Sequence, residues 1–228
     1  MDPSESTSEF VSLRRFQYEA IPGIFVHSEP PATLSVSRPL SAFGLKEYAS
    51  ATRWRDMKDR IAHLQRLEPR DTRYIVCWLA RHGQAWHNMN TFVGRDNTDT
   101  IGWDGHTADP PLTPLGEAQA KDVNSLWKAE IQQAHEEVFV DFKPTRLFCS
   151  PLTRALATME LTFEGFLLDE VAARAPEQRP LVLEGLREVM SPFTHDKRSS
   201  KSEILSRFPG VQIEDSFTEE ASFGHALL

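Results

Sequence analysis

The residues RHGQAWHN at positions 81–88 follow directly on an apolar run, and they combine an arginine, two histidines and an asparagine. A neutral imidazole can attack phosphorus, and a guanidinium binds phosphate oxygens through a bidentate fork. Arg81 and His82 stand side by side, with Asn88 close along the chain. Together these residue types predict a nucleophile in a pocket for a phosphoryl group.

Two residues far downstream complete the candidate chemistry. Arg154 lies in the first turn of a predicted helix, where unsatisfied backbone N–H groups favour anions, and Glu188 follows a short predicted strand. Each residue alone has a simpler interpretation. Arg-His-Gly is also typical of a turn with a packed histidine, Arg154 of a surface side chain, and Glu188 of a solvated carboxylate. The chemical interpretation therefore depends on a fold that brings them together.

Apolar periodicity predicts the first elements that must position these residues. A helix is expected over residues 46–67, closed by Pro69, because apolar residues recur at intervals of three and four. Residues 73–80 are almost continuously apolar, which favours a strand covered on both faces. Further strands are expected at residues 145–149 and 181–186.

Capping signals predict three more helices. Their expected first residues are marked by the pairs Thr113 with Pro114, Ser150 with Pro151, and Ser200 with Glu203, and the last helix should end at Pro209 and Gly210. Strands that alternate with helices indicate an α/β fold, a three-layer sandwich with a mostly parallel sheet. Ligands bind such sheets at the carboxyl ends of the strands, where Arg81, His82, Ser150 and Glu188 would lie.

Composition limits the classes of partner. The 228 residues, 40% of them hydrophobic, fit one domain at 46–228, preceded by an irregular proline- and serine-rich arm at 1–45. The net charge of −8 disfavours nucleic acid and anionic membranes, and neither a signal sequence nor a membrane-spanning stretch is found, so we expect a cytoplasmic protein. Cys77 and Cys149 lie in apolar runs and are expected to be buried free thiols.

Two other groups of residues could bind a ligand. His87 invites a metal interpretation, but no carboxylate stands nearby at ligand spacing, so we expect neither a metal nor another cofactor. A basic cluster, formed by His195, Lys197, Arg198 and Lys201, could recognise a second acidic group on a substrate. A solvated loop is the alternative, and we favour it slightly.

Four motifs in the same order resemble the histidine phosphatase superfamily, which includes cofactor-dependent phosphoglycerate mutases. They are RHGQAWHN, DPPLTPLGEAQA, SPLTRALAT and LREVM. The N-terminal arm and the stretch GLREVMSPFTHDKRSSKSEI are most similar to the fungal phosphomutase-like branch. The resemblance covers residues from about 16 to 220, and it implies the phosphoglycerate-mutase-like version of the α/β fold.

The resemblance also implies roles for the site residues. His82 would become phosphohistidine, Arg81 and Arg154 would clamp the phosphate, Asn88 would add a hydrogen bond, and Glu188 would be the acid. Members carry a second catalytic histidine far downstream of the glutamate. His225 is the only candidate here and lacks the usual apolar strand, so we expect the C-terminal part of the family fold to be missing.

The implied function is phosphoryl transfer on a small phosphorylated substrate, by a phosphatase or a phosphoglycerate mutase-like enzyme that needs no metal. A phosphatase is favoured, since a mutase must retain the phosphorylated intermediate and exclude water. The alternative is a catalytically weak or inactive relative that binds phosphorylated metabolites or a protein partner.

Overall fold

The computed structural model describes residues 17–28, 39–68, 71–89, 108–136, 141–168, 179–188 and 194–221. The chain divides into two compact units, Met1–Tyr48 and Ala49–Leu228. His225 and Pro69 lie outside the described residues, so the predictions made for them stay predictions. Among the described helices, none is at once long enough and apolar enough to cross a bilayer.

The described part of the first unit contains two short 3-10 helices, η1 (Val26–Ser28) and η2 (Ser41–Gly44). An antiparallel bridge joins Phe25 to Leu45, and Lys46 N–H donates to the Ile24 carbonyl at 2.9 Å. Ile24, Ala42 and Leu45 are buried. The boundary predicted between an arm at 1–45 and a domain at 46–228 stays a prediction.

Helix α1 (Arg53–Leu67) opens the second unit and starts seven residues later than the predicted helix. Its buried face presents Trp54, which stacks on Phe142 with 3.9 Å between ring centroids. Trp54 Nε1–H and the Arg53 guanidinium both donate to the buried carboxylate of Glu130, which lies in the helix at Pro114–Glu136. These hydrogen bonds join the two helices and satisfy the buried carboxylate. Glu68 is extended, as a residue before proline must be.

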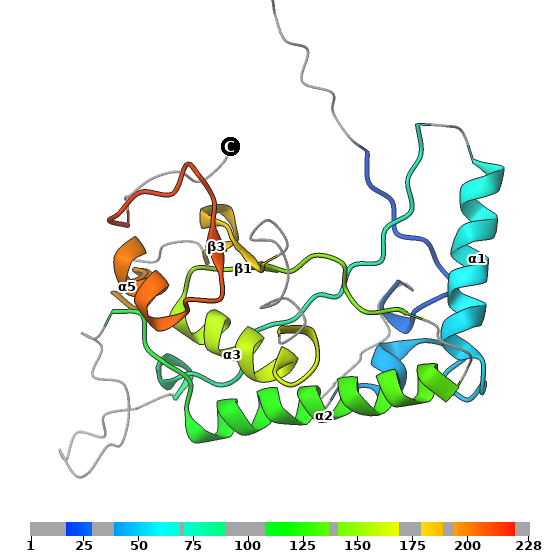
Figure 1. Ribbon diagram of the computed structural model, residues 1–228, viewed down its shortest axis with the longest axis horizontal. Helices are drawn as coiled ribbons and strands as arrows, with labels where there is room; N and C mark the ends of the chain where they lie inside the picture. Colours follow the sequence, from blue (N-terminus) through cyan, green and yellow to red (C-terminus); the bar gives the residue numbers. More distant parts are fainter. Residues whose placement is uncertain are drawn as a thin grey trace, which may run out of the picture. The chain divides into compact units, whose positions relative to one another are not determined.

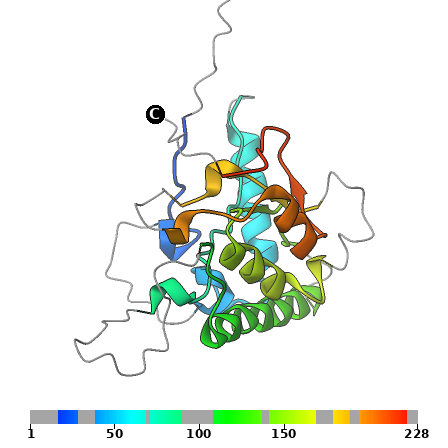
Figure 2. The same ribbon diagram turned by 90° about the vertical axis from the view of Figure 1, so that its left-hand side faces the viewer.

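Helix α2 (Pro114–Glu136) begins where its capping signal predicts. Thr113 Oγ1 accepts a hydrogen bond from Gly116 N–H at 3.1 Å, and Pro114 occupies the first helical position, where no N–H is required. Helix α3 (Thr153–Phe163) packs against α2, and the two lie side by side in Figures 1 and 2.

The start of α3 differs from the prediction. The helix begins at Thr153 rather than at Pro151, and the Ser150 hydroxyl accepts from Leu152 N–H at 3.4 Å instead of capping the helix. The carboxylate of Asp109 caps the helix instead, because it accepts from Thr153 N–H at 2.7 Å. The helix is therefore capped by Asp109, which is distant in sequence, and not by the neighbouring Ser150.

Within the described residues, three short parallel strands form a sheet in the order β1 (Phe148–Cys149), β2 (Leu181–Val182) and β3 (Gln212–Ile213). This arrangement of helices with a parallel sheet confirms the predicted α/β class. The strands pack with α3 and with α5 (Lys201–Arg207) around a common core that includes Leu156, Val182 and Ile204. Helix α5 has the predicted capping box, with Ser200 and Glu203 bonded to each other, and it ends before Pro209.

Residues 73–80 correct one prediction. They run as an extended segment that forms no described strand, and Ile75 and Leu79 are 77% and 93% exposed rather than covered on both faces. A strand requires a hydrogen-bonded neighbour, and no backbone hydrogen bond within the described parts of the chain pairs this segment with β1, β2 or β3. Cys77 lies on this segment and is exposed, so its predicted burial is wrong, whereas Cys149 is a buried free thiol.

Candidate active site

His82 follows the extended segment and is half-buried, with its ring fixed by the backbone of the next residue. Nδ1 lies 2.7 Å from the carbonyl oxygen of Gly83. A carbonyl can only accept, so Nδ1 carries the proton and Nε2 keeps its electron pair. The local backbone therefore selects the tautomer of an imidazole that can act as a nucleophile or as a ligand.

The loop that carries His82 is held by residues of two distant motifs. Gly83 N–H donates to Thr158 Oγ1 of α3 at 3.0 Å, and Gln84 N–H donates to Gln119 Oε1 of α2 at 2.8 Å. Thr113 N–H donates in turn to the Gln84 carbonyl at 2.9 Å. These hydrogen bonds fix the position of the loop relative to α2 and α3. They give a structural reason for the polar residues that the motifs share.

Gly83 and Gly116 allow this close approach. A Cβ atom on Gly116 would collide with the carbonyl group of Gln84, and one on Gly83 would collide with the carbonyl group of Gly116. Both collisions are with backbone, which cannot rotate away as a side chain can. The glycine of Arg-His-Gly and the glycine in the first turn of α2 are therefore required by the same contact.

Arg154 lies at the start of α3 and is fully buried. One terminal nitrogen, Nη1, donates to the His195 carbonyl at 2.9 Å, and the other, Nη2, meets Glu188 Oε2 at 3.0 Å and Asp196 Oδ1 at 3.3 Å. Nε is also buried and has no hydrogen-bond partner among the described residues. A buried guanidinium with two carboxylates and an unused N–H is suited to exchange one partner for an incoming anion.

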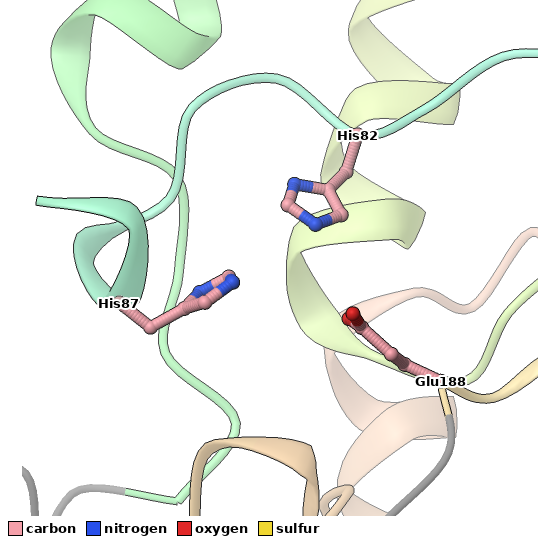
Figure 3. A group of neighbouring side chains, drawn as sticks. All are labelled: His82, His87 and Glu188. Atoms are coloured by element: carbon pink, nitrogen blue, oxygen red, sulfur yellow. The ribbon is translucent and has the colours of Figure 1, made fainter.

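Glu188 approaches the site from the segment that follows β2 and the 3-10 helix η5 (Glu184–Leu186). Its side chain is 57% exposed, and its carboxylate points toward the gap between His82 and His87 (Figure 3). The carboxylate therefore combines access to solvent with a fixed contact to Arg154. That is the placement that a proton donor to a leaving group needs.

His87 joins the site, although the sequence disfavoured it as a ligand. It lies on the 3-10 helix η3 (Trp86–Asn88), with its ring 5.5 Å from that of His82 and stacked on that of His195 at 5.0 Å. Ligand atoms of His82, His87 and Glu188 lie within 4.8 Å of one another (Figure 3). Sequence spacing could not reveal this cluster because its carboxylate comes from far along the chain.

Asn88 holds η3 in place. Its Oδ1 accepts from Ala85 N–H at 3.0 Å, and its Nδ2 lies 3.0 Å from His87 Nε2. The amide therefore donates to His87, whose Nε2 is an acceptor. Arg81 is exposed beside His82, and its charge acts on the His82 ring. Arg81, Arg154 and Glu188 thus act on the His82 ring, and Asn88 contacts its neighbour His87, while the predicted roles of all five residues stay predictions.

Burial and positive charge keep the two imidazoles neutral. Burial is the largest cause that lowers the pKa of His82 below its ordinary value of 6.5. The hydrogen bond to the Gly83 carbonyl opposes it, and the charges of Arg154 and then Arg81 lower the pKa further. Burial also lowers the pKa of His87 to about 4, with Arg154 as the next cause. Both rings are therefore neutral at neutral pH, and the electron pair of His82 Nε2 is available for reaction.

The predicted basic cluster divides into separate parts. Arg198 is buried and donates to Glu184 Oε2 at 2.6 Å and to carbonyl oxygens of residues 218–220, so neither substrate recognition nor a solvated loop describes it. His195 lies against His87, and its backbone binds Arg154. We call Arg198 a strut because its buried side chain joins Glu184 to residues 218–220. The charge pattern of the sequence does not distinguish such a buried arginine from one on the surface.

The motifs and the geometry agree with a comparison of families. A model of the histidine phosphatase superfamily (branch 1) matches residues 77–192, and the chain belongs to this superfamily. The match includes the loop of His82, the first turn of α3 and Glu188.

Fungal relatives are similar over most of the chain. A probable phosphoglycerate mutase of Arthroderma benhamiae is 29% identical over 231 residues, which cover 89% of this chain and 63% of the relative. Phosphomutase-like protein 3 of Candida albicans is 28% identical over 218 residues, with 90% and 58% covered. The chain thus spans about three fifths of the length of these relatives.

The chain is also similar to a solved structure, that of the ecdysone phosphate phosphatase from Bombix mori in complex with tungstate. It is 19% identical and covers 63% of this chain and 56% of its own, with a TM-score of 0.34. A score of this size has no bearing on the site.

Proposed function

We propose that the chain transfers the phosphoryl group of small phosphomonoesters through a phosphohistidine at His82. The observation that carries this proposal is the hydrogen bond between His82 Nδ1 and the Gly83 carbonyl, which leaves Nε2 as a nucleophile beside Arg154 and Glu188. Membership of the histidine phosphatase superfamily and the names of the fungal relatives support the same class of reaction.

In the first step, His82 Nε2 attacks phosphorus, so that an N–P bond forms while the P–O bond to the leaving group breaks. Glu188, protonated for this step, gives its proton to the departing alkoxide. In the second step, water attacks the phosphohistidine, the N–P bond breaks, and Glu188 takes up a proton from the water. The products are an alcohol and inorganic phosphate, and His82 regains its electron pair.

Arg154 stabilises the phosphoryl oxygens by exchanging partners. Its guanidinium binds the carboxylates of Glu188 and Asp196 when the site holds no phosphoester. A phosphoryl group that takes the place of Glu188 at Nη2 receives a charge-assisted hydrogen bond and releases the carboxyl group for proton transfer. Arg81 and Asn88 supply the other contacts of the clamp.

The contacts of Arg154 also favour a second candidate function. Both terminal nitrogens already have protein partners, and a clamp that does not release them would bind phosphoesters weakly without turning them over. This would be a weak or inactive relative that senses phosphorylated metabolites. The two candidates differ in turnover.

Hydrolysis of an aryl phosphate in the presence of a chelator separates them. We expect turnover by the purified chain, and a loss of at least about a thousandfold in His82→Ala, since losing a nucleophile costs more than losing one hydrogen-bond donor. His63→Ala, at an exposed histidine of α1, is the matched control and should keep full activity. Phosphate trapped on His82 should be labile to acid and stable to base.

Turnover that survives His82→Ala would overturn the proposal. Thermal stabilisation by phosphate with no turnover in either protein would support the second candidate instead.

A further inference from the structure

Three electron-pair donors converge beside the Arg-His-Gly loop. One ligand atom each from His82, His87 and Glu188 lies within 4.8 Å of the other two. Figure 3 shows the two imidazoles and the carboxylate directed toward one gap, although they come from three different segments. Two histidines with one carboxylate are the donor set by which proteins hold zinc and other divalent transition metals.

The hydrogen bonds around the two rings leave them in a form that binds metal. His82 donates through Nδ1 to the Gly83 carbonyl, a contact that in metal sites orients the ring and leaves Nε2 as the ligand. The electron pair of His87 Nε2 accepts from the Asn88 amide, so an ion bound there would replace this hydrogen bond. Of the two oxygens of Glu188, Oε2 meets Arg154, so the other has no partner among the described residues.

The charge around the gap permits a cation. The nearest buried positive charge, Arg154, forms ion pairs with both Glu188 and Asp196, at 3.0 and 3.3 Å. Glu188 and Asp196 offset the charge of Arg154, and the exposed Arg81 is the other cation that acts on the His82 ring. An incoming cation would therefore share Glu188 with Arg154 rather than face an uncompensated guanidinium.

We propose that His82, His87 and Glu188 bind a divalent transition-metal ion, with Zn²⁺ the best match to the donor set, and that the bound ion excludes phosphoesters. The ion would use the electron pair of His82 that attacks phosphorus. The inhibitory half of this inference rests on the proposed function, whereas the binding half rests on geometry alone. Ligands of a tetrahedral zinc lie about 3.4 Å apart at ordinary bond lengths, so binding draws the three ligand atoms together by up to about 1.4 Å.

Calorimetric titration of the full chain with zinc chloride, in buffer without phosphate or chelator, tests the binding. Cys77 is an exposed thiol that could bind zinc by itself, so the titration uses a Cys77→Ser background. We expect one site, weakened more than tenfold in His87→Gln and unchanged in His63→Gln, which makes the same chemical change at an exposed histidine of α1. Circular dichroism confirms that each variant folds, and Glu188→Gln serves as a second test of the ligand set.

The outcomes separate this inference from the proposed function. Zinc binding that depends on His87 and Glu188 supports the site, even where the chain hydrolyses no phosphoester. The site is overturned if zinc does not bind, or if His87→Gln and Glu188→Gln bind zinc as tightly as the Cys77→Ser parent. The proposed function still stands in that case if hydrolysis is seen. Where hydrolysis occurs, added zinc should inhibit it in competition with substrate, and a chelator should restore it. Inhibition that is not competitive would overturn the inhibitory half.

Discussion

Replacing Arg198 with methionine should destabilise the second unit strongly. Its side chain is fully buried and ties three parts of the chain together. Nε donates to Glu184 Oε2 at 2.6 Å, Nη2 donates to the Thr218 carbonyl at 2.9 Å, and the guanidinium lies 3.9 Å from the centre of the Phe217 ring. Methionine preserves much of the volume but removes every donor.

The expected magnitude follows from the bonds that find no replacement. The carbonyls of Glu219 and Glu220 also accept from Lys201 N–H and Thr218 Oγ1, so they keep partners and are left out of the estimate. The bond to the Glu184 carboxylate contributes about 1.5–3 kcal/mol and the bond to the Thr218 carbonyl about 0.5–1.5 kcal/mol. Glu184 also keeps its ion pair with Arg187, so we expect a loss of about 2–3 kcal/mol in unfolding free energy.

Thermal unfolding followed by circular dichroism measures this effect. A loss of about 2–3 kcal/mol lowers Tm by about 4–12 °C in a domain of this size. Arg66→Met is the matched control, because Arg66 is exposed in the last turn of α1, and it should change stability by less than about 0.5 kcal/mol. If the two variants unfold at the same temperature, the hydrogen bonds of Arg198 do not stabilise the second unit.

Two other predictions concern the Arg-His-Gly loop. Burial, together with Arg154 and Arg81, lowers the pKa of His82 below 6.5, and only the neutral ring can attack phosphorus. A profile of kcat/KM against pH should therefore fall on acidification with a midpoint below 6.5, and a midpoint above this value would contradict the assigned environment. Gly116→Ala should lose about 1–3 kcal/mol of unfolding free energy, since its Cβ meets the Gln84 carbonyl group, whereas Gly210→Ala, with open space around it, should stay within about 0.5 kcal/mol in denaturant titrations.

The sequence predicted best the features that depend on neighbouring residues. The caps of α2 and α5 were found because Thr113 bonds to Gly116 and Ser200 bonds to Glu203, within one turn of each helix. The cap of α3 was misassigned to Ser150 because its acceptor, Asp109, is brought in by the fold. For the same reason the strand expected at residues 73–80 was wrong, since apolar content favours a strand but a ladder needs a partner.

The candidate site shows the same division. His82, Arg154 and Glu188 could be chosen from motifs because each keeps a fixed place in its own motif. His87 was disfavoured because the carboxylate beside it lies about a hundred residues away along the chain. Arg198 was interpreted as part of a basic cluster because burial, which separates a strut from a surface charge, is a property of the folded chain.

Asp109 shows why the motifs must act together. This buried residue has a φ of 50°, a conformation that aspartate tolerates better than most residues. Its carboxylate accepts from the N–H and hydroxyl of Thr153 and from those of Ser199, at 2.7–3.1 Å. The next residue after Thr153 is Arg154 and the residue before Ser199 is Arg198, so one carboxylate fixes the backbone beside both buried guanidinium groups. Arg154 and Arg198 therefore share Asp109 as an anchor, and replacing either side chain should shift the backbone of the other through this carboxylate.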